Sequence, residues 1–394
     1  MERTNRRTFM KQSTTAGFGL AAFSLSARRI YGAESGSFNR VVYRMLGSTG
    51  YKASEMGFGA MNMREPALVR AVIDSGINYI DTAHSYMNGA NEEIIGTVMK
   101  TRRNEVFLTT KIKFDKDGVE IAKMPGMIET SLKRLQTDHV DLVLLHITDK
   151  REQVFRDDLM KVFENARDKG QTRFIGVSTH ENQAEVLDAV VESKFWQAVL
   201  VGYNYYSPPE VTVAIQKARE AGIAIIGMKN LITIERPRKP FPDIRENKTG
   251  TTTNQQALLK WVLNNPYVDT VVPGMTSFEQ LADDIAVMGK KLTYDDRRIL
   301  KRYSEKAEGR YCCGVSGCTG CREQCPYGVN VSQINRCLNY AEGYGDIGLA
   351  YENYRSLPPD SRADKCEDCD ECLVECVNGI NLQENIRRAR VMFG

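Results

Sequence analysis

The run VDLVLLH at residues 140–146 is apolar and has the length of a strand, and TRFIGV at residues 172–177 has the same character. Between them, residues 153–169 carry apolar side chains at helical spacing. A strand, a helix and a second strand in this order form the unit from which parallel sheets are built. These residues therefore predict an α/β fold, and the same alternation continues on both sides of them.

Strands and helices alternate from about residue 41 to residue 274, and eight repeats in that length fit a closed (β/α)8 TIM barrel better than an open sheet. An open dinucleotide-binding sheet also needs a third glycine, which Gly57-Phe58-Gly59 lacks. The motif GSTG at 47–50 predicts a hairpin over the barrel floor within residues 41–51. The strands are expected at 55–59, 77–81, 106–111, 140–146, 172–177, 198–201, 223–228 and 268–273, with helices at 66–75, 127–136, 153–169 and 209–222.

The composition is that of an ordinary globular chain, with 42% hydrophobic and 26% charged residues. The net charge of +3 is too small for a protein that binds nucleic acid, so that class of partner is excluded. All ten cysteines lie between Cys312 and Cys376. The chain is therefore expected to hold a barrel at residues 34–305, with a last helix at 292–305, and a small cysteine-rich domain at residues 306–394.

The first 33 residues resemble a twin-arginine signal peptide. Arg6-Arg7 precedes a mildly apolar stretch at 15–27, which is too short for a permanent membrane helix. Cleavage is expected between Ser26 and Ala33, and the protein is expected in the periplasm, exported in its folded state. No other stretch approaches about 18 apolar residues, so no stable membrane span is expected.

Four polar residues stand where predicted strands end, which is the face of such a barrel that carries the chemistry. A tyrosine with a pKa near 10 transfers protons poorly at neutral pH unless an ammonium and a carboxylate shift that pKa. A neighbouring histidine can orient a carbonyl oxygen. One of these residues alone would be a cap, a rim aromatic, half of an ion pair or a core histidine, but the four together predict a catalytic set: Asp81, Tyr86, Lys111 and His146.

The stretches NYIDTAHSY at 78–86, TTK at 109–111 and LLH at 144–146 resemble the aldo-keto reductase family, over about residues 44–284. The resemblance implies hydride transfer between NADP or NAD and a small carbonyl or alcohol substrate, with Tyr86 as the general acid or base. It also implies a cofactor site at Ser178, Asn204, Met228, Lys229, Gly274, Met275, Ser277 and Gln280. No arginine or lysine lies between Val272 and Gly289, so either the preference for NADP or the affinity for nucleotide is expected to be reduced.

The cysteines form two runs with the spacing of a bacterial ferredoxin, in which the fourth cysteine of each run binds the other cluster. Val315 stands where the first run should begin, so Cys312 or Cys313 is expected to replace it. Cys337 is left over. The pattern predicts a ferredoxin-like domain with two 4Fe–4S clusters, one held by Cys312 or Cys313, Cys318, Cys321 and Cys376, the other by Cys325, Cys366, Cys369 and Cys372.

Two other interpretations of the cysteines are weaker. Zinc ribbons use two CxxC units and not a run of four cysteines, and closely spaced thiols form disulfides poorly. Two functional hypotheses follow. The first is an oxidoreductase that exchanges electrons through its clusters, with a redox protein as a further partner. The second is a non-catalytic barrel used for docking, beside an electron-transfer tail. Trp196 and the loop 203–206 could pack a sugar ring as substrate, and His84 and His180 could line the site.

Overall fold

The computed structural model describes residues 41–114, 121–231, 252–307, 312, 318, 321, 324–343, 347–366, 369, 372–376 and 379–394. The predicted signal peptide and Cys313 lie outside these residues. Val41–Gly394 form one compact unit. Among the described residues, no helix is long and apolar enough to cross a membrane.

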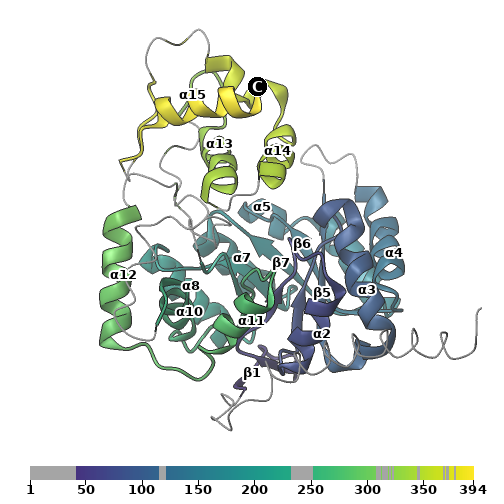
Figure 1. Cartoon of the computed structure of the whole chain (residues 1–394). Helices are drawn as coiled ribbons and strands as arrows, with labels where there is room; N and C mark the ends of the chain where they lie inside the picture. The colour runs from purple at the N-terminus through teal and green to yellow at the C-terminus, as the bar shows by residue number, and fades with distance from the viewer. Residues whose placement is uncertain are drawn as a thin grey trace, which may run out of the picture. The chain divides into compact units, whose positions relative to one another are not determined.

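Eight strands form one parallel sheet in chain order, from β3 to β10. Isolated bridges pair Met56 with Val271 and Gly59 with Gly274, so the first and last strands meet. The predicted (β/α)8 barrel is therefore confirmed (Figure 1). Its strands are β3 (Phe58–Gly59), β4 (Tyr79–Asp81), β5 (Phe107–Lys113), β6 (Val140–His146), β7 (Thr172–Thr179), β8 (Ala198–Gly202), β9 (Ala224–Met228) and β10 (Thr270–Val271).

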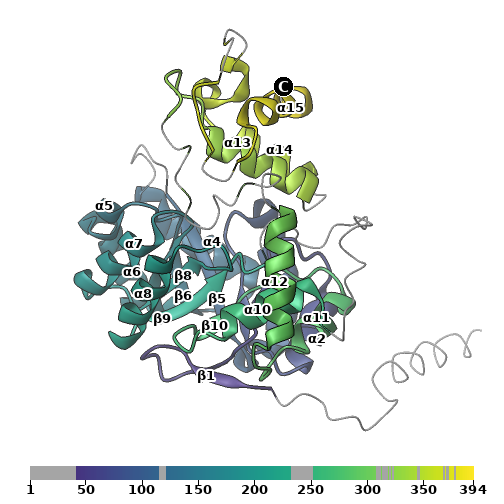
Figure 2. The ribbon, with the colours of Figure 1, turned by 90° about the vertical axis from the view of Figure 1, so that its left-hand side faces the viewer.

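Helices surround this sheet, as Figures 1 and 2 show. The helix expected at 153–169 is in fact two, α5 and α6, because the backbone leaves the helical conformation at Phe155 and Arg156. The other predicted helices are present with ends shifted by a few residues. The helices are α2 (Pro66–Asp74), α3 (Ala90–Arg102), α4 (Met124–Leu135), α5 (Arg151–Val154), α6 (Asp157–Asp168), α7 (Gln183–Ser193), α8 (Pro209–Glu220), α10 (Asn254–Leu263), α11 (Phe278–Ile285) and α12 (Tyr294–Ala307).

The core has two layers. One apolar cluster lies between strands and helices, and a second fills the barrel interior with side chains such as Phe107, Leu144 and Ile226, all without solvent exposure. A parallel strand buried on both faces needs a nearly continuous apolar sequence, which explains runs such as VDLVLLH. The barrel is thus a packed core that leaves its strand ends for polar residues.

The barrel floor is covered by the predicted hairpin of β1 (Tyr43–Met45) and β2 (Lys52–Ser54), which pair antiparallel. The Gly47 amide donates to Asp269 Oδ2 at 2.9 Å, and the Ser48 amide donates to the Gly222 carbonyl. Gly47 has φ of +50°, and a Cβ there would collide with the backbone of Ala224. Only glycine therefore allows the hairpin to approach the floor this closely.

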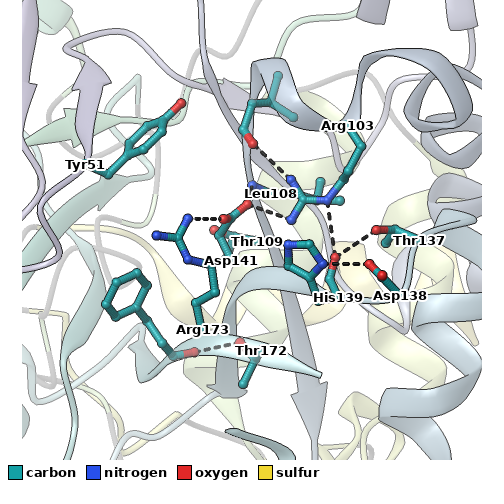
Figure 3. Close-up of polar contacts among 12 residues, drawn as sticks. Tyr51, Arg103, Leu108, Thr109, Thr137, Asp138, His139, Asp141, Thr172 and Arg173 are labelled. Atoms are coloured by element: carbon teal, nitrogen blue, oxygen red, sulfur yellow. Dashed lines mark hydrogen bonds and ion pairs between the residues drawn. The ribbon is translucent and has the colours of Figure 1, made fainter. Parts of the chain in front are cut away.

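A buried carboxylate also joins three strands on this side of the barrel (Figure 3). Asp141 on β6 accepts hydrogen bonds from Arg103 Nη2 at 2.7 Å, from the Leu108 amide of β5 at 2.9 Å and from Arg173 Nη1 of β7 at 3.0 Å. Each carboxylate oxygen thus has a donor, which is what a buried charge requires. Asp141 is a structural residue at the opposite strand end from His146.

The cysteine-rich tail has its own apolar cluster, drawn from residues between Cys312 and Phe393. Its described residues include helices but no strand, so a ferredoxin-like fold is not shown, and that prediction still depends on the cysteine spacing alone. The elements are α13 (Val331–Leu338), a π-helical turn at Asn339–Gly343, α14 (Ile347–Arg355) and α15 (Leu382–Phe393).

Candidate active site and cysteine loops

Two adjacent strands bring three of the four predicted catalytic residues into contact. The Lys111 ammonium on β5 donates to Asp81 Oδ2 of β4 at 2.7 Å and to the Thr82 carbonyl at 2.6 Å. It also donates to Tyr86 Oη at 3.1 Å. Lys111 is 1% exposed and Asp81 is 4% exposed, so the ion pair is buried and each charge compensates the other.

Tyr86 reaches the ammonium because the chain turns sharply after β4. Its amide donates to the Ala83 carbonyl, and the next two residues, Met87 and Asn88, have left-handed backbones. The Lys111 Nζ lies 4.5 Å from the centroid of the Tyr86 ring, so the ammonium contacts the hydroxyl and also the ring face. The tight turn therefore fixes the phenol on the lysine.

Burial and neighbouring charges together set the protonation states at this site. Burial lowers the pKa of Lys111, but Asp81 and Tyr86 outweigh burial and raise that pKa, so the ammonium stays charged. The pKa of Tyr86 is shifted upward, because burial raises it and the adjacent Lys111 offsets only part of that shift. Tyr86 is therefore a protonated phenol at neutral pH, ready to give its proton.

His146 at the end of β6 lies beside the tyrosine, with 6.1 Å between ring centroids and the rings edge to face. Burial, followed by the charges of Lys111 and other cations, lowers its pKa well below 6.5, so the imidazole is neutral. Its Nδ1 is buried and has no hydrogen-bond partner among the described residues. The four predicted residues thus lie together, with a phenol and an imidazole as the groups that can face a carbonyl oxygen.

The two other histidines at strand ends have different surroundings. His180, after β7, has its ring centroid 6.2 Å from that of His146 and belongs to the site. His84 bonds through Nδ1 to Ser131 of α4 at 2.9 Å, so it packs against that helix. Trp196 is 1% exposed, and its indole donates to the Val154 carbonyl within the core. The expectation that Trp196 could pack a sugar ring is therefore wrong.

The predicted cofactor residues of β7 to β9 are buried and close to one another. Ser178 Oγ accepts from the Ile147 amide at 3.1 Å, directly after His146. Asn204 Nδ2 donates to the Lys229 carbonyl at 3.3 Å, and Met228 ends β9 just before that lysine. These contacts join the ends of three neighbouring strands at the edge where His146 lies.

The remaining predicted cofactor residues lie at the start of α11. Ser277 caps this helix and accepts from the Gln280 amide at 3.3 Å, while Gln280 Oε1 accepts from the Thr276 amide at 2.6 Å. Gly274 has open space where a side chain would be, and Met275 is fully buried. A helix start with a nearby glycine is the usual setting for a phosphate group.

The thiols of the tail form two sets, and the members of each set lie near one another. Burial raises the pKa of Cys321 to about 11, with further contributions from Cys318 and Cys376. Burial likewise raises the pKa of Cys366 to about 11, with contributions from Cys325, Cys369 and Cys372. Cys312 is buried and its carbonyl accepts from Asn339. Each set thus includes the last cysteine of the other run.

The nine described cysteines are free thiols, so no disulfide is present among them. In the described part of the chain, no group of three or more Asp, Glu, His or Cys side chains is arranged to hold a single metal ion. In an iron–sulfur cluster the four thiolates bind different iron atoms, so their sulfur atoms stand further apart than the ligands of one ion. The thiol chemistry and the two sets therefore fit clusters. Cys337 is a buried core thiol of α13, 2% exposed.

Comparison with known proteins adds independent findings. The model of the aldo/keto reductase family matches residues 47–233. An uncharacterised oxidoreductase of Bacillus subtilis is 25% identical over 305 residues, which cover 67% of this chain and 96% of the relative. A solved aldo-keto reductase of Bacillus halodurans, in its holo form, is 25% identical with a TM-score of 0.55 and covers 67% of this chain and 96% of its own. An aldo/keto reductase of Klebsiella pneumoniae, solved with NADP and acetate, is 25% identical with a TM-score of 0.55. The match covers 66% of this chain and 94% of that one.

Proposed function

We propose that this chain, an NAD(P)-dependent oxidoreductase of the aldo/keto reductase type, interconverts a carbonyl and an alcohol on a small molecule and exchanges the electrons through two 4Fe–4S clusters. The contact of Lys111 Nζ with both Asp81 and the Tyr86 hydroxyl supports the interconversion of a carbonyl and an alcohol. A barrel used only for docking gains nothing from a buried lysine–tyrosine–carboxylate set, so the docking alternative is not favoured.

Tyr86 supplies the proton in the direction of reduction. When a hydride reaches the carbonyl carbon, the C=O π bond breaks and the oxygen takes the proton of the Tyr86 hydroxyl. The phenolate that remains is stabilised by Lys111, whose charge Asp81 keeps in place. His146, held neutral, can donate an N–H to the same oxygen and orient the substrate. Oxidation of an alcohol is the reverse of these steps.

The residues present fit a nicotinamide nucleotide. Asp81 Oδ1 is buried without a hydrogen-bond partner among the described residues, and the predicted cofactor residues Ser178 and Asn204 are fully buried. The start of α11 suits a phosphate. When bound, the nucleotide supplies or accepts the hydride. The structure of the Klebsiella relative with NADP supports NADP as the nucleotide of this chain, although 272–289 offers no cation to a 2′-phosphate.

The two thiol sets would hold the clusters: Cys318, Cys321, Cys376 and Cys312 or Cys313 for one, Cys325, Cys366, Cys369 and Cys372 for the other. Such clusters carry single electrons to a redox partner protein, so a pair of them suits a two-electron reaction. Twin-arginine export of the folded protein to the periplasm accords with cluster assembly before transport, and the arginine pair at residues 6–7 supports it.

A Tyr86→Phe variant tests the proposal. Removing the hydroxyl should lower kcat/KM by roughly a hundred- to ten-thousand-fold, because the Tyr86 hydroxyl held by Lys111 is the proposed proton donor. Nicotinamide absorbance and cluster absorbance are followed together, under anaerobic conditions, with a panel of aldehydes, ketones and alcohols. In the wild-type protein, oxidation of an alcohol should bleach oxidised clusters, and reduction of an aldehyde or ketone should restore the absorbance of reduced clusters; in the variant both signals should slow together.

Tyr51→Phe is the matched control, because Tyr51 Oη donates to the Asn78 carbonyl just before β4 begins, at the opposite end of that strand from Asp81, and the substitution should leave the rates unchanged. Equal rates in Tyr86→Phe and wild type would remove Tyr86 from the mechanism. A wild-type protein that turns over substrates without any change in cluster absorbance would overturn the electron-exchange half.

A further inference from the structure

The catalytic site receives side chains from the cysteine-rich tail, at positions between the two cysteine runs. Gln333 Nε2 of α13 donates to Glu181 Oε1, the residue after His180, at 3.0 Å. Three and seven residues further along lie Arg336 and Tyr340. The charge of Arg336 acts on both His146 and His180, and Tyr340 acts on Tyr86, so α13 and the following turn border the catalytic residues.

These tail residues form a cationic group with Lys229 of the barrel. Arg336 Nε donates to Tyr340 Oη at 2.7 Å, and its Cζ lies 5.5 Å from the centroid of that ring. Lys229 Nζ lies 5.9 Å from the same centroid. Tyr340 is 3% exposed, so an arginine and a lysine are held on one buried phenol. Gln333 Oε1 accepts from Arg336 Nη1 at 3.4 Å and further fixes the guanidinium.

His146 and His180, beside this cationic group, each bury a ring nitrogen. His146 and His180 are 8% and 7% exposed, and the Nδ1 of each has no hydrogen-bond partner among the described residues. Burial, followed by the surrounding cations, keeps both imidazoles neutral. Two buried polar atoms without partners, next to two cations, are typical of a site that binds a polar ligand.

We propose that Arg336, with Lys229 and His180, binds a carboxylate group of the substrate while Tyr86 and His146 hold its reacting oxygen. The substrate class is thus an aldehyde, ketone or alcohol that also carries a carboxylate. This inference rests on the proposed carbonyl–alcohol reaction. A planar guanidinium matches a carboxylate with two parallel N–H donors.

Carboxylates near the proposed site disfavour the double charge of a phosphate. Asp149 accepts from the His180 amide at 2.7 Å, and Glu181 accepts from Gln333 Nε2 at 3.0 Å. Burial raises the pKa of Tyr340, but Arg336 and Lys229 outweigh burial and lower it below its usual 10. A singly charged carboxylate meets less repulsion there than a doubly charged phosphate.

The test compares acids with their uncharged amides: succinic semialdehyde and para-carboxybenzaldehyde, each beside its primary amide. The wild-type holoenzyme should favour the acid in kcat/KM by about tenfold or more, the usual weight of a charged hydrogen bond. In Arg336→Gln this ratio should fall toward one through a higher KM for the acid, and Arg336→Lys should give an intermediate ratio. Arg355→Gln, which removes an arginine from the Tyr351 ring elsewhere in the tail, should keep the wild-type ratio.

Equal turnover of acids and amides by the wild-type protein, or an unchanged ratio in Arg336→Gln, would overturn the carboxylate site and leave the proposed reaction standing. If no carbonyl compound is turned over, the proposed reaction fails. In that case, calorimetry measures the binding of benzoate, benzamide and phenyl phosphate to the holoprotein and tests the carboxylate site without turnover. Tighter binding of benzoate than of the other two, lost in Arg336→Gln, supports it; tighter binding of phenyl phosphate or of benzamide contradicts it.

Discussion

At the scale of single residues, the site is organised by charge and burial. Lys111 is charged because Asp81 compensates the cost of its burial, whereas His146 and His180 are neutral because burial, and then the cations around them, oppose a positive charge. Residue types at strand ends indicated which groups would meet. The pKa shift of each group depends on what surrounds it, so no spacing rule could show that the pKa of Tyr86 is raised and those of the two histidines are lowered.

The two neutral histidines make stability depend on pH. Their pKa values in the folded protein lie below the 6.5 of an unfolded histidine, so the unfolded chain binds more protons as the pH falls below about 6.5. The stabilisation is complete above that pH and is lost toward acid, by up to about 1.4 kcal/mol per pH unit for each histidine. Urea unfolding between neutral and mildly acid pH, followed by the fluorescence of the barrel tryptophans Trp196 and Trp261, measures this slope.

A His180→Gln variant should show a shallower slope than the wild-type protein, because one proton fewer is taken up on unfolding. His146→Gln should reduce the slope in the same way. If both variants keep the wild-type slope, the histidines are not held neutral in the folded protein.

At the scale of elements, the fold follows from alternating apolar runs, and particular buried charges hold neighbouring strands in register. The apolar run 140–146 predicted β6 with its observed ends, since an apolar run of that length has few alternatives. The break between α5 and α6 was missed because residues 153–169 keep helical spacing across it, and no proline or glycine marks the turn at Phe155 and Arg156.

Asp141 gives the prediction that belongs to this scale. Asp141→Asn removes the charge that Arg103 and Arg173 share and should lower the free energy of unfolding by about 3 kcal/mol, because the buried Arg103 contact loses its partner. Asp138→Asn, three residues earlier and with a side chain 93% exposed, is the matched control and should change little. Equal urea midpoints for the two variants would show that Asp141 does not join the strands.

At the scale of the whole molecule, the chain combines a barrel with a cysteine-rich tail that also contributes to the barrel's strand-end face. Gln333 and Arg336 lie between the two cysteine runs, where no motif distinguishes them. Their spacing along α13 could indicate a helix, but nothing in the sequence could place that helix beside His146 and His180. The cysteine runs, in contrast, carry their own spacing and could be interpreted without the barrel.

The two thiol sets predict separate effects of cysteine substitutions. Cys321→Ala and Cys366→Ala should each remove one cluster, so that about half of the iron, roughly four of eight atoms, is lost in each variant. Cys337→Ala should retain all of it, because Cys337 is a core thiol of α13. Iron and acid-labile sulfide analysis of anaerobically purified protein measures this. Complete iron loss in both single variants, or zinc in place of iron, would contradict two separate sets.

By itself, the sequence determined the barrel, the hairpin over its floor and the identity of the polar residues at the strand ends, because apolar periodicity and short motifs are local properties of a chain. The tertiary structure alone decided which of those residues share a space. It separated His84 from His180, buried Trp196 in the core, raised the pKa of the Tyr86 phenol and brought Arg336 to the histidines. These outcomes depend on burial and on the electric field of residues distant in sequence, and neither quantity exists until the chain is packed.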